Sequence, residues 1–203
     1  MSERWVPLDI ADCDPNPFVQ FRYWFDEATS EMPDREAVAL VSVGGDGQPS
    51  ARMVLLRLVD ATSFGWYTNY HSRKARELDA NPRAALLWYC ANLGRQIRIE
   101  GLVEQMTPDE SDAYFATRAR GHQIGAHASD QSQPIVSRRV LEERVEATEE
   151  LFEGRDVARP EQWGGFRLRP SAFEFWQHRT DRLHDRVRYE LDVNHWHRER
   201  LAP

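Results

Sequence analysis

The sequence predicts a mainly β, α+β fold in which a mostly antiparallel sheet or barrel carries a few helices on its outside. Short β-rich segments are separated by turns or single helices rather than by strict strand–helix alternation, which is typical of antiparallel sheets. The chain has 203 residues and is 41% hydrophobic, which suits one domain and is short for two. We therefore expect an arm over residues 1–16 and one domain over residues 17–203.

One helix and a series of short strands are predicted in order along the chain. Apolar residues at helical spacing predict a helix over 18–30, and Pro33 ends it. A Gly-Gly-Asp-Gly turn between the β-rich segments 37–43 and 49–59 predicts a hairpin. By the same criteria, further strands are expected over 64–68, 84–89 and 96–105, from 163 up to 191, and over 196–201.

Three further helices have recognisable ends. Ser72 is an N-cap for a helix over 73–80. The run Thr107–Glu110 combines an N-cap, a proline at the first helical position and a capping-box glutamate, so a helix is expected through about residue 117. The segment 137–153 is amphipathic, and we expect its less polar side chains to face inward, namely Val140, Leu141, Val145, Thr148, Leu151 and Phe152.

The composition argues against several classes of partner and location. A formal net charge of −7 and a pI near 5.5 disfavour nucleic acid and anionic membranes as main partners. No apolar run approaches the roughly 20 residues of a membrane span, and residues 1–4 do not begin a signal peptide, so a cytoplasmic location is expected. Cys13 and Cys90 fit no metal-binding spacing, so we expect free thiols and no metal site.

The C-terminal part contains cationic or potentially cationic side chains at alternate positions. Arg182, His184 and Arg186 would project from one face of an extended strand, with Leu183 and Val187 on the other face. Such a row is unfavourable unless an anionic or electron-rich group lies against it. We therefore predict a binding surface here.

A second candidate site lies where a predicted strand leads into the helix 73–80. Exposed N–H groups and the positive end of the helix dipole attract phosphate. Arg73 and Lys74 lie in the first turn, where each cation costs about 0.3–1 kcal/mol, and a bound phosphate would reverse that cost. The alternative is that both are surface cations paired with Glu77 or Asp79.

Arg52 and Arg57 add two cations to the predicted strand 49–59. Their separation of five residues places them on opposite faces of a regular strand. They can therefore serve one site only if a bulge or a second subunit intervenes.

Many short motifs follow one another in an informative order and spacing. They are Arg52–Arg57, Tyr67–Asn69, Ser72–Lys74, Arg95–Gln96, Gln123–Ala126, Gln131–Ser132, Trp163–Phe166, Glu174–Gln177, Arg182–Arg186 and Arg200–Pro203. Together, from about Pro17 onward, they resemble the pyridoxine (pyridoxamine) 5′-phosphate oxidase family. The resemblance implies an FMN-binding split β-barrel that forms a homodimer, with the flavins bound in clefts between the subunits.

The resemblance also implies which residues bind the cofactor and the substrate. FMN contacts would come from Arg52, Met53, Val54, Leu55, Arg57, Tyr67, Thr68, Arg73, Lys74, Gln96, Gln131, Ser132, Trp176 and Arg186. The substrate would be bound by Arg57, Tyr114, Arg118 and His122 at its phosphate and by the catalytic candidates Arg182 and His184 at its ring. The C-terminal segment would serve both dimerisation and substrate binding.

The implied reaction oxidises pyridoxine or pyridoxamine 5′-phosphate to pyridoxal 5′-phosphate. A hydride passes from the substrate C4′ carbon to the flavin, which O₂ reoxidises with release of hydrogen peroxide. Arg182 would orient the substrate ring and His184 would hydrogen-bond its polar edge, so neither acts as a nucleophile.

Three positions depart from the family pattern. Arg57 replaces a lysine, His122 a small hydroxyl residue and His127 an aromatic residue. Arginine is larger than lysine and bidentate, so these changes affect substrate identity more than FMN binding. Two alternatives stay open, namely a related flavin oxidase of phenazine-biosynthesis type and an FMN- or pyridoxal-phosphate-binding protein without turnover.

Overall fold

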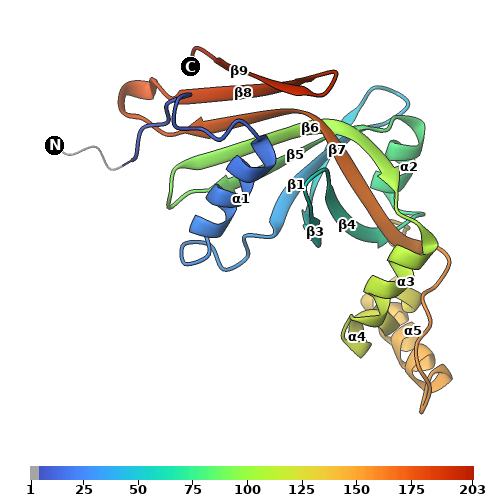
Figure 1. The fold of residues 1–203 in the computed structure, drawn as a ribbon. Coiled ribbons are helices and arrows are strands. Elements are labelled where there is room, and N and C mark those ends of the chain that lie inside the picture. The colour runs from blue at the N-terminus through green and yellow to red at the C-terminus, as the bar shows by residue number, and fades with distance from the viewer. Residues whose placement is uncertain (1–4) are drawn as a thin grey trace.

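A computed structural model describes residues 5–203, and a curled sheet dominates it (Figure 1). The elements in chain order are α1 (Pro17–Glu27), β1 (Ala37–Val43), β2 (Pro49–Leu55), β3 (Leu58–Val59), β4 (Phe64–Asn69), α2 (Arg73–Ala80), β5 (Arg83–Cys90), β6 (Arg95–Gln105), α3 (Pro108–Ala116), α4 (Arg120–Ala128), α5 (Arg138–Leu151), β7 (Trp163–Gln177), η1 (Thr180–Arg182), β8 (Asp185–Asp192) and β9 (His195–Arg200).

The predicted mainly β architecture with outer helices is confirmed. Within residues 5–203 the sheet has nine strands in the order β2-β1-β5-β6-β7-β4-β3, and β8 pairs with β7 and β9. Its strand pairs are antiparallel. The 15-residue strand β7 joins two parts of the sheet, because its first residues pair with β4 and its last residues with β8.

Helix α1 packs an aromatic face against the sheet. The rings of Phe18 and Phe21 lie 5.6 and 4.8 Å from that of Phe64, and Trp24 lies edge-on to Phe175 at 5.3 Å. These side chains belong to the main core. Burial of one such side chain contributes about 1.5–3 kcal/mol, so α1 is a fixed part of the domain.

The predicted arm is packed from residue 5 onward, and residues 1–4 lie outside the described residues. The amide of Leu8 donates to Oδ2 of Asp185 at 3.1 Å, and the hydroxyl of Tyr189 donates to the carbonyl oxygen of Asp14 at 2.7 Å. Leu8 is itself buried. The arm therefore lies against β8 rather than extending freely.

The prediction that Arg182, His184 and Arg186 share one strand face was wrong. Asp181 and Arg182 adopt left-handed backbone angles, with φ of 56° and 62°, and belong to η1. The strand β8 begins only at Asp185, so the chain turns between the first and second of the three residues. Leu183 is exposed rather than facing the core.

The helices and the first hairpin differ from prediction in three places. The predicted strand 49–59 is interrupted between β2 and β3. Helix α4 was not predicted, and its N-cap Ala119 makes no side-chain cap. No residue of α5 is fully buried, but the side chains predicted to face inward are its partly buried ones, namely Val140, Leu141, Val145, Thr148 and the following Phe152, so the prediction is wrong only for the exposed Leu151. Val145 and Phe152 pack beside a small cluster around Phe115.

Two expectations from composition can be compared with the structure. Cys13 and Cys90 are free and buried. Among residues 5–203, no helix has both the length and the apolar character needed to cross a bilayer.

Candidate functional site

A pocket of about 390 Å³, which we term the anion pocket, lies beside the end of β2 and the start of α2. Its lining residues are Met53, Val54, Leu55, Arg57, Tyr67, Thr68, Lys74, Tyr114, Arg118, His122, Gln131 and Trp163. Three of them are cationic (Arg57, Lys74 and Arg118) and none is a carboxylate, although the chain carries a net charge of −7. This local excess of positive charge indicates an anionic ligand.

Lys74 is the only lysine of the chain, and it is buried. Its Nζ donates to Oγ1 of Thr68 at 2.9 Å and to Oε1 of Gln131 at 2.8 Å. Burial, and then the charge of Arg52, lower the pKa of Lys74 to about 8 against the opposing effect of Glu77. Within residues 5–203 its hydrogen-bond partners are neutral, so its charge is available to a ligand.

Arg118 lies against the aromatic wall of the anion pocket. Its guanidinium carbon is 4.5 Å from the ring centroid of Trp163, and the rings of Tyr67 and Tyr114 stack 3.8 Å apart. Among the described residues, Nη1 of Arg118 is buried without a hydrogen-bond partner. Burial lowers the pKa of Arg118. Tyr114 opposes this shift, and the charge of Arg57 adds to it. A bound anion would recover the free energy lost at this unpartnered donor.

Arg52 and Arg73 are paired with Glu77. Nη2 of Arg52 donates to Oε2 of Glu77 at 2.9 Å, and Nε of Arg73 donates to Oε1 at 2.7 Å. The predicted surface pairing is therefore confirmed for Arg73 and wrong for Lys74. Arg52 faces Glu77, whereas Arg57 lies in the interruption between β2 and β3 and lines the anion pocket, so the spacing rule for a regular strand does not apply to this pair.

Five of the remaining predicted residues form a second group, the C-terminal cluster, which consists of Gln96, Trp176, Arg182, His184 and Arg186. Trp176 is opposite Gln96 on β6 and opposite Arg186 on β8, and its ring lies 4.5 Å from that of His184. Nε of Arg186 donates to Oε1 of Glu174 at 2.9 Å. Within residues 5–203 the Arg182 guanidinium makes no hydrogen bond or ion pair, which leaves it available to a ligand.

Two neighbours that the sequence analysis missed determine the state of His184. The backbone N–H of Arg179 donates to Nδ1 of His184 at 3.1 Å, so the neutral ring carries its proton on Nε2. The ring of His178 lies 5.1 Å away. Burial, His178 and Arg182 all lower the pKa of His184. Near neutral pH, His184 is therefore a neutral Nε2–H donor, and the only sequence signal for this was a second histidine six residues earlier.

The anion pocket and the C-terminal cluster lie at opposite ends of β7, the long strand whose course Figure 1 shows. Trp163 at the start of this strand lines the pocket, and Trp176 near its end belongs to the cluster. Roughly 40 Å of extended strand separates the two residues. One chain therefore does not unite all the predicted site residues. Ser132, with a φ of 67°, lines a smaller cavity next to Gln131.

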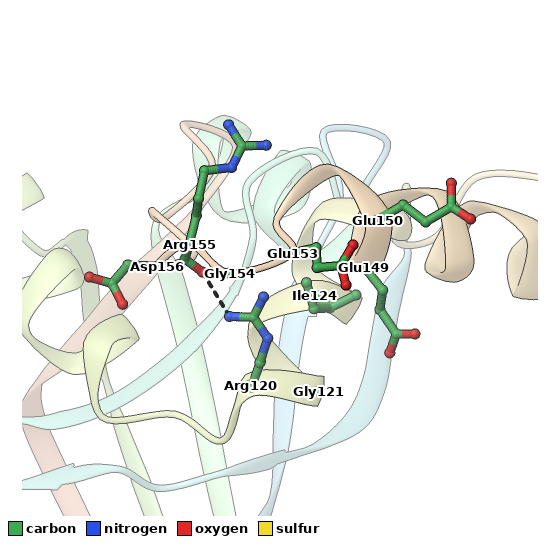
Figure 2. Close-up of a pocket in the computed structure, with 9 residues that line it drawn as sticks. All are labelled: Arg120, Gly121, Ile124, Glu149, Glu150, Glu153, Gly154, Arg155 and Asp156. Atoms are coloured by element: carbon green, nitrogen blue, oxygen red, sulfur yellow. Dashed lines mark hydrogen bonds between the residues drawn. The ribbon is translucent and has the colours of Figure 1, made fainter.

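A larger cavity of about 760 Å³ lies between α4 and the end of α5 and has a different character (Figure 2). Arg120 donates from Nη1 to the carbonyl oxygen of Arg155 at 2.9 Å and from Nη2 to that of Phe152 at 2.6 Å, so its charge is used at the C-terminal end of the helix. The cavity's other charged lining residues are four carboxylates and one cation, namely Glu149, Glu150, Glu153, Asp156 and Arg155. None of the predicted site residues lines this cavity, and we do not assign the phosphate site to it.

The chain matches two family models that together cover most of its length. Residues 25–152 match the model described as pyridoxamine 5′-phosphate oxidase, and residues 163–203 match the pyridoxine 5′-phosphate oxidase C-terminal dimerisation region. A pyridoxine/pyridoxamine 5′-phosphate oxidase of Cupriavidus taiwanensis is 50% identical over 198 residues, covering 97% of this chain and 93% of the relative. The corresponding protein of Rubrobacter xylanophilus is 51% identical over 191 residues, covering 94% and 88%.

Solved structures agree with these matches. PhzG from Burkholderia lata 383, in complex with tetrahydrophenazine-1-carboxylic acid, has a TM-score of 0.91 at 30% identity and covers 98% of this chain and 100% of that chain. A pyridoxamine 5′-phosphate oxidase-related, FMN binding protein from Nostoc punctiforme has a TM-score of 0.72 at 16% identity, with 92% and 97% covered. The second likeness shows a shared fold alone.

Proposed function

Because this chain belongs to the pyridoxine/pyridoxamine 5′-phosphate oxidase family and has its split-barrel fold, we propose that it is an FMN-dependent oxidase that forms pyridoxal 5′-phosphate. Its substrates would be pyridoxine and pyridoxamine 5′-phosphate, with O₂ as acceptor and hydrogen peroxide as product. The main support for the proposal is the anion pocket, which is lined by three cations and by no carboxylate, because both FMN and the substrate bear a phosphate group. We also propose that the protein forms a homodimer and is located in the cytoplasm.

The residues around Lys74 fit a phosphorylated flavin. Its buried ammonium group has only neutral partners, and both Nη groups of the adjacent Arg73 have no partner within residues 5–203. Each charge-assisted hydrogen bond contributes about 1.5–3 kcal/mol, so two such cations retain a dianion. When bound, FMN supplies the redox chemistry by accepting electrons from the substrate and passing them to O₂.

Arg118 provides the second anion site, for the substrate phosphate. Its buried Nη1 donor, together with Arg57, gives two guanidinium groups in one pocket, and both Tyr114 and His122 also line it. Arginine binds phosphate oxygens in pairs, so these groups would fix the orientation of the phosphate as well as its position.

The C-terminal cluster of a second copy of the chain would complete the site. The matched dimerisation region, residues 163–203, contains four of its five members. In this arrangement the Nε2–H of His184 donates to the polar edge of the substrate ring, and the free guanidinium of Arg182 holds the ring in place. These contacts orient the C4′ carbon and exclude water from it, which is a positioning role.

The substrate is tested by aerobic incubation of the FMN-loaded protein with pyridoxine or pyridoxamine 5′-phosphate. We expect aldehyde and hydrogen peroxide in equal amounts. A phenazine-type oxidase, which the TM-score of 0.91 to PhzG favours, would instead oxidise a reduced phenazine carboxylate and leave both B6 phosphates unchanged. A binding protein without turnover would produce no peroxide with any of them.

The shared site is tested by mixing two impaired variants, Arg118→Met and Arg182→Leu, and measuring activity at a substrate concentration well below KM. In a mixed dimer one of the two sites has both residues intact, so random reassociation should restore about a quarter of the wild-type activity. If each chain built its own site, mixing would restore nothing. Reassociation is verified separately by tagging one variant and recovering both chains together.

A further inference from the structure

Glu77 is a buried carboxylate, expected from the sequence only as a possible partner for Arg73 or Lys74. It lies on α2 and is 7% exposed. Its Oε2 accepts hydrogen bonds from the hydroxyls of Ser42 and Ser50, both at 2.6 Å, and from Nη2 of Arg52 at 2.9 Å. Its Oε1 accepts from Nε of Arg73 at 2.7 Å. Burial raises the pKa of Glu77, and these bonds together hold it at about 2.

Arg73 donates its hydrogen bond to Glu77 from Nε, so the two Nη groups at the end of the guanidinium stay free among the described residues. Nε is the only donor of Arg73 with a partner in the described part of the chain, and the side chain is 59% exposed. Both Nη groups, which can bind phosphate bidentately, therefore have no partner in the described part of the chain. An arginine held in this way loses less rotational freedom when a phosphate binds.

The bond to Arg52 has the opposite effect. Nη1 of Arg52 donates to the carbonyl oxygen of Leu40 at 3.2 Å and to Oγ of Ser42 at 2.5 Å, and Nη2 donates to Glu77 and to Oγ of Ser50. Both Nη groups are thus used within the protein. Arg52 ties β2 to α2 and contributes charge, whereas Arg73 retains free donors.

Glu77 also acts on Lys74 through space. It raises the pKa of Lys74 in opposition to burial and to the charge of Arg52. It thus favours the charged form of the one buried ammonium group that faces the anion pocket.

We propose that Glu77 is a positioning residue for the cofactor phosphate: it holds Arg73 through Nε, which leaves both Nη groups free, and it immobilises Arg52. This rests on the proposed function, since it names the group that orients the phosphate ligands of that same site. A carboxylate near a phosphate would weaken binding if its charge alone mattered. Positioning predicts the reverse, namely that its removal weakens binding.

The test compares FMN with riboflavin, which has the same ring and no phosphate, by fluorescence titration of the flavin-depleted protein. For E77Q we expect FMN affinity to fall about ten- to a hundredfold and riboflavin affinity to stay within about twofold. A merely structural role would weaken both ligands by the same factor. Unchanged or tighter FMN binding by E77Q would also overturn the proposal.

Three further variants make the result specific. E143Q removes an exposed carboxylate from another Arg–Glu pair at the same i,i+4 spacing, Arg139–Glu143, and should change neither affinity. R73Q should reproduce the FMN-specific loss, and it keeps the proposal testable if E77Q does not fold. The R73Q/E77Q double variant should lose less than the product of the two single losses, because Glu77 acts through Arg73. Fully multiplicative losses would exclude that route.

A failure of the proposed function gives a different result. If the wild-type protein binds neither flavin, the assignment of FMN is wrong and the role of Glu77 with it. If the wild type binds FMN and only the E77Q result disagrees, the oxidase proposal remains and the positioning role is rejected.

Discussion

Nζ of Lys74 lies 2.8 Å from Oε1 of Gln131, a neutral partner contributed by the segment that follows α4. This contact joins the start of α2 to a residue 57 positions later in the chain and closes one side of the anion pocket. Because the partner carries no charge, hydrogen bonds to neutral groups and no direct ion pair stabilise the buried ammonium group in the part of the chain that the structure describes.

FMN affinity should depend on pH through Lys74. Its pKa is lowered from 10.5 to about 8, and phosphate binds the charged form. Affinity should therefore be constant between pH 7 and 8 and should fall above pH 8 by up to about tenfold per pH unit. FMN titrations from pH 7 to 10 measure this, and K74M should bind more weakly without any such decline. A decline of the same size in K74M would assign it to another group.

The lowered pKa of Lys74 has the opposite effect on folding, because it makes the free energy of unfolding rise with pH. Between about pH 8 and 10.5 the unfolded chain binds more protons at Lys74 than the folded protein does. The contribution of Lys74 to the stability of the flavin-free protein should therefore be most unfavourable below pH 8 and should become less unfavourable as the pH rises. Urea unfolding of the wild type and K74M at pH 7.5 and 9.5 should show a smaller difference at the higher pH.

Replacement of Arg118 by methionine should separate function from stability. We expect kcat/KM for pyridoxine 5′-phosphate to fall about ten- to a hundredfold, because a buried donor to the phosphate is lost. The free energy of unfolding should change little, since the lost guanidinium contact with Trp163 is offset by removal of the buried Nη1 donor that has no hydrogen-bond partner in the described chain. R120M is the matched control: it removes the bonds to the end of α5, so its stability should fall by about 1 kcal/mol with kinetics unchanged.

The left-handed backbone at Arg182 also allows effects on stability to be separated from effects on turnover. With a φ of 62°, this residue is more strained than a glycine would be, so R182G should be more stable than R182A by about 1 kcal/mol. R182G, R182A and R182L should all retain FMN and lose turnover, since each lacks the guanidinium. Turnover in any of them would remove Arg182 from the catalytic assignment.

The acid side of the pH–rate profile should move when His178 is replaced. Protonation of His184 at Nδ1 breaks its bond to the Arg179 amide, so activity should fall as the ring becomes charged. His178 is one of the groups that lower the pKa of His184, so H178Q should shift this fall to higher pH. H197Q, at an exposed site on β9, should leave the profile in place.

Elements with local signals were predictable, and their ends were too. Helix α2 spans the predicted residues 73–80, and β1 spans the predicted 37–43. The capping box of α3 forms as expected between Thr107 and Glu110. In these cases the information lies within a few neighbouring residues, where turn and cap chemistry acts.

Features that depend on distant partners or unusual backbone angles were not predictable. Nothing local marks Asp181 and Arg182 as left-handed, so the alternating cations were taken for a strand. Glu77 was considered only as a partner for its helix neighbours, because Ser42 and Ser50 are 35 and 27 residues away. The division of the site between the two ends of β7 also depends on tertiary structure alone.

The midpoint of β7 has a consequence for any cell that makes two versions of this protein. Gly101 on β6 pairs with Pro170, and a Cβ at this glycine would lie 2.1 Å from the carbonyl oxygen of Arg169, so a side chain there must displace β7. In the proposed dimer each reaction centre takes one end of this strand from each chain. An allele with a larger residue at position 101 would therefore damage both centres of every mixed dimer, so a cell making equal amounts of both chains would keep intact centres in only about a quarter of its dimers.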